Sequence, residues 1–221
     1  MKPAAIPDDA DMGWMDSPAR GLNLAALVGS RLCHDLISPL GAIGNGVELL
    51  EMSGDFPGIA KSPELSLIGE SVEAARARIK LFRVAFGHAP ADQRMGIGEL
   101  AGLLSAYARG GRLTVEVDGT GDMSRADARL LSLAAMCMGS AMPWGGRLLV
   151  CRAGPGWRLV GEAARTRVDL PLWGWLDGRA GGHRPAPEPS EVHFPLLGLA
   201  AAESGRHLTW ELDEIGAEIA F

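Results

Sequence analysis

A histidine and an aspartate stand side by side in the segment SRLCHDLISPL, and together they could form a nucleophile oriented by a carboxylate. If the segment is helical, each residue is rotated by about 100° from the one before it, so His34 projects about 200° away from both Leu32 and Leu36. His34 then faces solvent, with Asp35 as its neighbour and Ser38 one turn further along the same face. A carboxylate commonly orients a nucleophilic imidazole and stabilises the charge that develops on it. We therefore take His34, Asp35 and Ser38 as candidate catalytic residues.

Pro39 lies inside the same expected helix, where it removes a backbone donor and leaves the carbonyl of Asp35 without its partner. A proline in a helix interior costs about 3 kcal/mol, which core packing alone does not explain. An exposed histidine on a helix is usually inert, but at His34 a histidine, an aspartate and a proline coincide. The other histidines lack this context and are interpreted as structural: His88, His183, His193 and His207.

Two long helices are predicted to position these residues. The first spans residues 20–53 and the second residues 62–86, which open with Ser62 as N-cap and Pro63 at the first helical position. Both helices carry apolar residues at steps of three and four, the pattern of an amphipathic helix. In the first helix these are Leu24, Val28, Leu32, Leu36, Leu40, Ile43, Val47 and Leu50. In the second they are Leu65, Ile68, Val72, Ala75, Ile79, Phe82 and Phe86.

A short loop that contains Gly54 and Pro57 joins the two helices into an antiparallel hairpin. One hairpin cannot cover two apolar stripes alone. We therefore expect a second copy of the chain to complete a four-helix bundle. Packing of both stripes on the rest of the same chain is the alternative.

The second half of the chain alternates between helical and strand patterns, which predicts an α/β sandwich and an α+β fold class overall. Helices are expected at residues 97–108, 124–142, 168–176 and 191–203. Strands are expected at residues 112–117, 148–152, 157–162, 207–212 and 215–221, with a loop at 177–190. The predicted organisation is a mobile tail over 1–18, a hairpin domain over 19–88, a linker over 88–96 and the sandwich over 96–221.

The sequence HDLISPL resembles the H-box of histidine kinases, in which His is followed by Asp or Glu, Leu, two further residues, Pro and Leu. The wider segment LVGSRLCHDLISPLGAIGNGVELLE is similar to the ChpT-type histidine phosphotransferases of bacterial phosphorelays, and the resemblance extends over residues 20–221. It implies that the hairpin dimerises into a four-helix bundle. It also implies that the sandwich is a degenerate form of the ATP-binding domain of histidine kinases.

The nucleotide-binding motifs of a working kinase domain are absent from this sequence. A working kinase domain has a helix whose asparagines bind magnesium and phosphates. Counting back from the turn at residues 143–146, the two asparagine positions of that helix fall on Leu133 and Cys137, and neither ligates magnesium through oxygen. No DxGxG motif occurs, and the glycine loop aligns with a segment that holds bulky Phe194 and Leu196. Such side chains block the close backbone approach that phosphate binding needs. We expect no ATP binding and no intrinsic cofactor.

The resemblance implies that a phosphoryl group passes from a receiver aspartate to His34 and then to the aspartate of another receiver, with Mg²⁺ supplied by the receiver. The implied donor is the receiver of a CckA-type hybrid histidine kinase that controls the cell cycle. The implied acceptors are CtrA- and CpdR-type response regulators. Docking is expected on an apolar patch beside the histidine with a polar rim. The candidate docking residues are Arg31, Leu32, Ile37, Ile43, Arg76, Ile79, Lys80 and Arg83.

Two other classes compete with this interpretation: an ATP-dependent histidine kinase, and a non-catalytic dimeric scaffold in which His34 is incidental. The missing nucleotide motifs disfavour the kinase. Ser38 stands where many kinases of this type hold a Thr or Asn that orients a hydrolytic water, so slow dephosphorylation is a further expectation.

The composition excludes several kinds of partner. Among 221 residues, 21 Lys and Arg stand against 27 Asp and Glu, and the net charge of −6 disfavours nucleic acid. The sequence shows neither a secretory signal nor an apolar run of about 18 residues that could span a membrane. Cys33, Cys137 and Cys151 have no CxxC spacing, so reduced thiols and a cytoplasmic location are expected.

Overall fold

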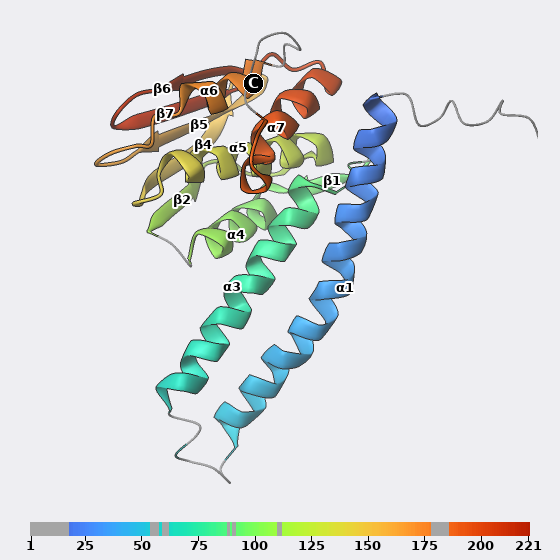
Figure 1. The fold of residues 1–221 in the computed structure, drawn as a ribbon, viewed down its shortest axis with the longest axis vertical. Helices are drawn as coiled ribbons and strands as arrows, with labels where there is room; N and C mark the ends of the chain where they lie inside the picture. The colour runs from blue at the N-terminus through green and yellow to red at the C-terminus, as the bar shows by residue number, and fades with distance from the viewer. Residues whose placement is uncertain are drawn as a thin grey trace, which may run out of the picture.

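The structure is a computed structural model, and it describes residues 18–53, 58, 62–87, 89, 92–109, 112–177 and 186–221, with side chains from Leu27 onward. The rest of the predicted tail, His88 and His183 lie outside these residues. Figure 1 shows a long helical hairpin joined to a sandwich of helices and strands, which confirms the predicted fold class. Within the described part of the chain, no helix is long and apolar enough to cross a membrane.

The hairpin consists of α1 (Pro18–Met52) and α3 (Pro63–Ala85). Helix α1 begins at the last residue of the predicted tail and runs without interruption through Pro39. Helix α3 begins where the sequence predicts, because the Ser62 hydroxyl accepts a hydrogen bond from the Leu65 amide at 3.1 Å.

The side of α1 that packs against α3 shares Leu40 and Val47 with the predicted stripe but is otherwise made of different residues. It consists of buried or half-buried residues at steps of four and three: Cys33, Ile37, Leu40, Gly44 and Val47. The predicted positions that stay exposed are Val28, Leu32, Leu36, Ile43 and Leu50. The two sets lie roughly a quarter of a turn apart on the helix. Spacing alone did not separate them, because α1 is apolar over a broad arc that covers both.

The sandwich contains a five-stranded sheet in the order β2-β4-β5-β7-β6. Its strands are β2 (Leu113–Val117), β4 (Gly146–Ala153), β5 (Gly156–Glu162), β6 (Thr209–Leu212) and β7 (Gly216–Ala220). The β2–β4 pair is parallel and the other pairs are antiparallel. All five strands lie within or overlap the predicted strand segments.

The helices of the sandwich lie between the sheet and the hairpin (Figure 1). They are α4 (Ile97–Ala108), α5 (Arg125–Ala141) and α7 (His193–Glu203), with shorter turns at α6 (Leu170–Trp173), η2 (Gly174–Asp177) and η3 (Pro189–Glu191). Helix α5 begins where the Ser124 hydroxyl accepts from the Asp127 amide at 3.0 Å. It is buried on most of its circumference, because it contacts α3, α7 and the sheet.

A second, two-stranded sheet was not predicted. It pairs β1 (Arg94–Gly96) with β3 (Asp122–Ser124) in antiparallel register. Strand β1 occupies the end of the predicted linker, so the sandwich begins two residues before the predicted position 96. Three-residue strands are too short to show an alternating pattern in a sequence.

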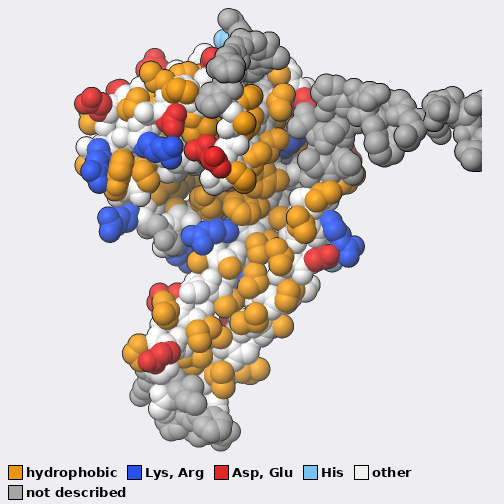
Figure 2. All heavy atoms as spheres, in the orientation of Figure 1, with side chains coloured by type: hydrophobic (Ala, Val, Ile, Leu, Met, Phe, Trp, Pro, Cys, Tyr) orange, Lys and Arg blue, Asp and Glu red, His pale blue; other side chains and the backbone are white. Residues whose placement is uncertain are grey.

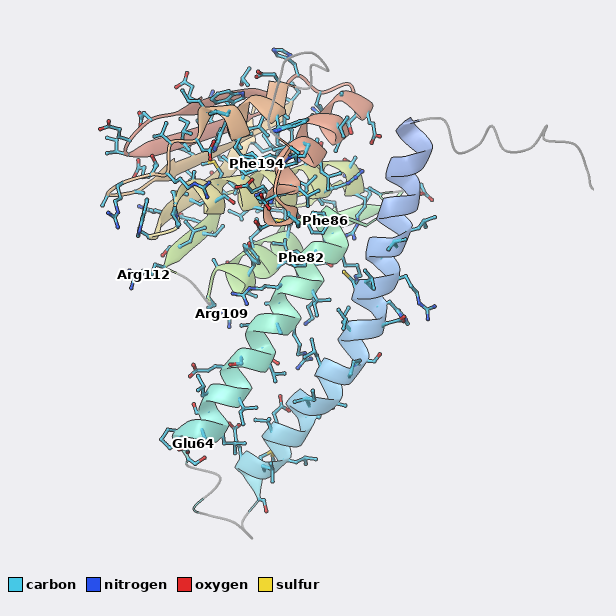
Figure 3. The ribbon with its side chains drawn as sticks, in the orientation of Figure 1. Glu64, Phe82, Phe86, Arg109, Arg112 and Phe194 are labelled. Carbon is cyan, nitrogen blue, oxygen red and sulfur yellow. The ribbon has the colours of Figure 1, made fainter. Side chains whose placement is uncertain are left out.

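The last turns of α3 are part of the core of the sandwich. Leu81, Val84 and Ala85 are buried in the same cluster as Leu100 of α4 and Leu130 of α5. Figure 3 labels Phe82 and Phe86 on these turns, where the hairpin meets the sandwich. The hairpin therefore does pack on the rest of its own chain. It does so through Leu81, Val84 and Ala85, which the sequence did not single out, together with Phe82 and Phe86 of the predicted stripe.

Candidate functional site

His34 projects from α1 into solvent with 78% of its side chain exposed. Its Nδ1 lies 3.1 Å from Oδ1 of Asp35, and Oδ2 of the same carboxylate accepts a hydrogen bond from Nε of Arg31 at 2.7 Å. The three side chains form one exposed chain of contacts, in which Arg31 fixes the carboxylate and the carboxylate fixes the imidazole. The α-helix produces this arrangement because Arg31 and Asp35 are four residues apart and His34 precedes Asp35.

The electrostatics of the site keep Asp35 ionised. Its hydrogen bond with His34, and then that with Arg31, lower the pKa of the Asp35 carboxyl below its ordinary value. An ionised carboxylate accepts the Nδ1–H of the ring, which leaves the lone pair on Nε2. The structure gives Nε2 no partner among the residues it describes. With one proton on the ring, held at Nδ1, the arrangement presents an oriented Nε2 that can act as a nucleophile.

Ser38 and Pro39 follow on the next turn of α1, and both are exposed. Ser38 is four residues from His34 and lies on the same side of the helix. Pro39 lacks the N–H that would bond the carbonyl of Asp35, so this carbonyl has no donor in the helix ladder.

The structure brings only some of the eight predicted docking residues to the His34 side of the hairpin. Arg31 contacts the site directly, and Lys80 and Arg83 are exposed on α3. Half-buried Arg76 lies in the seam and binds Glu73 through Nη1 at 2.7 Å.

The other predicted docking residues are half-buried or lie on another side of α1 from His34. Ile37 and Ile79 are half-buried on the inner sides of α1 and α3. Leu32 and Ile43 belong to the exposed stripe, about half a turn away from His34 on α1.

A groove between α3 and α4 was not expected from the sequence, because its two walls are distant in the chain. It encloses about 510 Å³. Its lining residues are Glu70, Glu73, Ala74, Ala77, Lys80, Glu99, Gly102, Leu103, Ala106 and Arg109. Of the predicted residues it contains only Lys80, and spacing within one helix gave no signal for the α4 wall.

The positions where the resemblance places nucleotide-binding groups are filled by hydrophobic packing. Leu133, Cys137 and Phe194 are completely buried. Burial raises the pKa of the Cys137 thiol well above its ordinary value. The Phe194 ring packs against Trp173, with the ring centroids 6.0 Å apart. Figure 3 labels Phe194 within the sandwich.

Metal-ligating side chains do not cluster in the described part of the chain. Among those residues, no group of three or more His, Cys, Asp or Glu side chains is placed to hold a metal ion.

Comparisons with known proteins give consistent matches. A family model described as the histidine phosphotransferase C-terminal domain matches residues 97–216. The protein phosphotransferase ChpT of Brucella abortus (strain 2308) is 37% identical over 131 residues, which are 58% of this chain and 60% of that protein. The match therefore spans less than two thirds of this relative's length.

One solved structure is similar in fold, and a second gives a weaker match. A bacterial phosphotransferase structure matches with a TM-score of 0.62 and 24% identity, and the match covers 92% of this chain and 97% of the other. The histidine kinase domain of a blue-light activated kinase from Erythrobacter litoralis EL346 matches with a TM-score of 0.44 and 15% identity, over 83% of this chain and 93% of the other.

Proposed function

Because this chain belongs to the histidine phosphotransferase family, we propose that it carries phosphoryl groups between receiver domains of a bacterial phosphorelay on His34. The observation that carries the proposal is the exposed imidazole of His34, held at Nδ1 by Asp35 and open to solvent at Nε2. A receiver can reach this nitrogen without any movement of the hairpin.

The chemistry follows from this orientation. The lone pair on Nε2 of His34 attacks the phosphorus of a receiver aspartyl phosphate, and a P–N bond forms as the P–O bond to the aspartate breaks. The receiver recovers its carboxylate, and the Nδ1 proton stays between His34 and Asp35. The carboxylate of Asp35 stabilises the positive charge that the ring acquires. Transfer to a second receiver reverses these steps, and positioning and charge neutralisation supply most of the catalysis.

The partners belong to the same proposal. The donor is the receiver of a CckA-type hybrid histidine kinase, and the acceptors are CtrA- and CpdR-type response regulators in the cytoplasm. Each receiver brings its own Mg²⁺, and the chain uses no ATP. The apolar packing around Leu133, Cys137 and Phe194 supports this last point, because these positions hold no polar group for magnesium or phosphate.

We further propose that two copies of the chain pair through their hairpins. In one chain, Leu32 is 58% exposed, Leu36 49% and Ile43 50%, and Ile68 of α3 is also exposed. Figure 2 shows hydrophobic side chains spread over this face of the hairpin, with charges at its edge. A contiguous apolar face of this kind marks an interface, and a second hairpin buries it as a four-helix bundle.

Label transfer tests the phosphotransferase proposal. The protein is incubated with radiolabelled phospho-receiver of a CckA-type kinase in Mg²⁺, and separately with labelled ATP. We expect label from the receiver only, in wild type and in His207→Ala, whose histidine is also exposed, and none in His34→Ala. Label from ATP would establish a kinase instead. Label from neither source, or retained in His34→Ala, would overturn the proposal.

A further inference from the structure

The groove between α3 and α4 lies close to the level of His34 along the hairpin. Gly29 of α1 lies beside Phe86 of α3, since a Cβ on this glycine would be 3.6 Å from the Phe86 Cβ. In an antiparallel pair this register places Cys33 level with Arg83. Burial raises the pKa of the Cys33 thiol, and the Arg83 cation lowers it, which agrees with a position of Arg83 close to Cys33. Lys80, one turn before Arg83, lines the groove.

The groove also opens on the face of the hairpin that His34 occupies. On α1, His34 is rotated by about 100° from the seam residue Cys33, away from the exposed stripe. On α3, Lys80 is rotated by about 60° from Arg83, away from exposed Ile68. Because the helices are antiparallel, both rotations lead to the same face. The sandwich leans towards this face and leaves the opposite, apolar face free.

A receiver domain bound at His34 is large enough to reach across α3 to this groove. Even a domain of about 100 residues has a radius of gyration of about 13 Å. Packed helices lie about 8–10 Å apart, so a domain of this size that covers His34 and lies over α3 also reaches α4. Helix α4 cannot swing aside easily, because Leu81 and Val84 hold α3 in the core of the sandwich.

We propose that the exposed face of α4 is the second wall of a docking cleft whose first wall is α1 at His34, and that the occupant is the receiver domain that exchanges phosphoryl groups with His34. This inference rests on the proposed function. It assigns the degenerate sandwich a role in partner binding, through a named face.

The chemistry of the groove suits a protein surface. Its lining includes the small residues Ala77 and Gly102, which allow a partner's backbone to come close. Lys80, Glu99 and Arg109 stand along its walls, and none has an ion-pair partner among the residues that the structure describes. Figure 3 labels Arg109 at the end of α4. Unpaired charges of both signs complement a receiver surface that carries the opposite pattern, and select against other surfaces.

Two matched glycines of α4 provide the test. A Cβ at Gly102 or at Gly98 meets nothing within 4 Å, but only Gly102 lines the groove. We expect Gly102→Trp to raise the receiver concentration for half-maximal transfer by about tenfold or more, with an unchanged maximal rate, because His34 is untouched. Gly98 is exposed one turn before Gly102 but does not line the groove, so Gly98→Trp should raise this concentration clearly less than Gly102→Trp does. Equal effects of both variants, or none, would overturn the proposal.

Hydrogen exchange on the wild-type protein gives an answer that depends on no substitution. The probe is the beryllofluoride-activated receiver of a CckA-type kinase. We expect slower exchange both in α1 around His34 and in α4 over residues 99–109. Protection of α1 alone overturns this inference and leaves the proposed function standing, whereas protection of neither, together with no transfer, overturns both. A groove filled by a second copy would show α4 protected without receiver, which also contradicts the inference.

Discussion

At the scale of single residues, the site depends on how one exposed imidazole is held in a productive orientation. A free side chain on a helix surface samples several rotamers, and ordering it costs conformational entropy. The contacts from Arg31 to Asp35 and from Asp35 to His34 lie on one helix, so the α1 backbone sets their spacing. The orientation therefore needs no tertiary contact, and the same surface stays open for a receiver.

Replacement of Asp35 by asparagine should slow transfer without unfolding the protein. The amide side chain would keep the shape of the carboxylate but lose the charge that stabilises the imidazolium, so we expect the maximal rate to fall by about tenfold or more. Asp35→Glu should recover part of this loss. Single-turnover transfer from a labelled receiver measures both variants. Since the pKa of Asp35 is lowered, its protonation should not affect the wild-type rate between about pH 6 and pH 8.

His193 should make stability depend on pH. It is 3% exposed, and its Nε2 lies 3.0 Å from the Ser140 hydroxyl, which donates to the Met136 carbonyl. Burial lowers the pKa of His193 to about 4. The unfolded chain, with a histidine pKa of about 6.5, takes up a proton that the folded state does not. Stability is therefore complete above about pH 6.5 and falls with pH, by about 2 kcal/mol at pH 5.

Urea unfolding at a series of pH values measures this dependence. His193→Gln should lose the part of the slope that lies between about pH 6.5 and pH 5, whereas His207→Gln, at an exposed position, should keep it. Identical slopes in wild type and His193→Gln would show that His193 is not held neutral.

At the scale of elements, α3 has one side that packs on α1, one that packs into the sandwich and one that lines the groove with α4. The sequence predicted these three sides unequally well. The capped start of α3 and its heptad pattern predicted the helix and the seam against α1. The face made by Leu81, Val84 and Ala85 was missed, because these residues adjoin the heptad stripe and their partners come from α4 and α5. The His34–Asp35 pair was predictable because one helix positions it. The α3–α4 groove was not, because it depends on where a distant helix packs.

The exposed stripe of α1 should determine the oligomeric state. Leu36→Glu places a charge on this stripe, and we expect it to convert a dimer of about 46 kDa, twice 23.2 kDa, into a monomer. Leu49→Glu is the matched control, because Leu49 is 69% exposed but lies on another side of α1. Light scattering after size exclusion measures the mass. A monomeric wild type, or dimers of both variants, would contradict the proposed pairing.

At the scale of the whole molecule, the hairpin and the sandwich share one hydrophobic core through the end of α3. A domain that swings on a linker would unfold separately from its neighbour. Here the loss of the sandwich would expose Leu81 and Val84, and the loss of the hairpin would open the core against α4 and α5. Shared burial of this kind couples the two parts in one unfolding transition.

Leu81→Ala should therefore destabilise both parts together, by about 2–5 kcal/mol, because Leu81 is fully buried at their junction. Tryptophan fluorescence reports mainly on the sandwich, which holds five of the six tryptophans: Trp144, Trp157, Trp173, Trp175 and Trp210. Circular dichroism at helical wavelengths also reports on the hairpin. The two midpoints should coincide in wild type and should shift together in Leu81→Ala.

Leu65→Ala, at the loop end of the hairpin, should shift them less, because Leu65 is not part of this core cluster. A helical signal that melts separately from the fluorescence would show that the sandwich is mobile, and α4 would then lose the fixed position that the docking cleft requires.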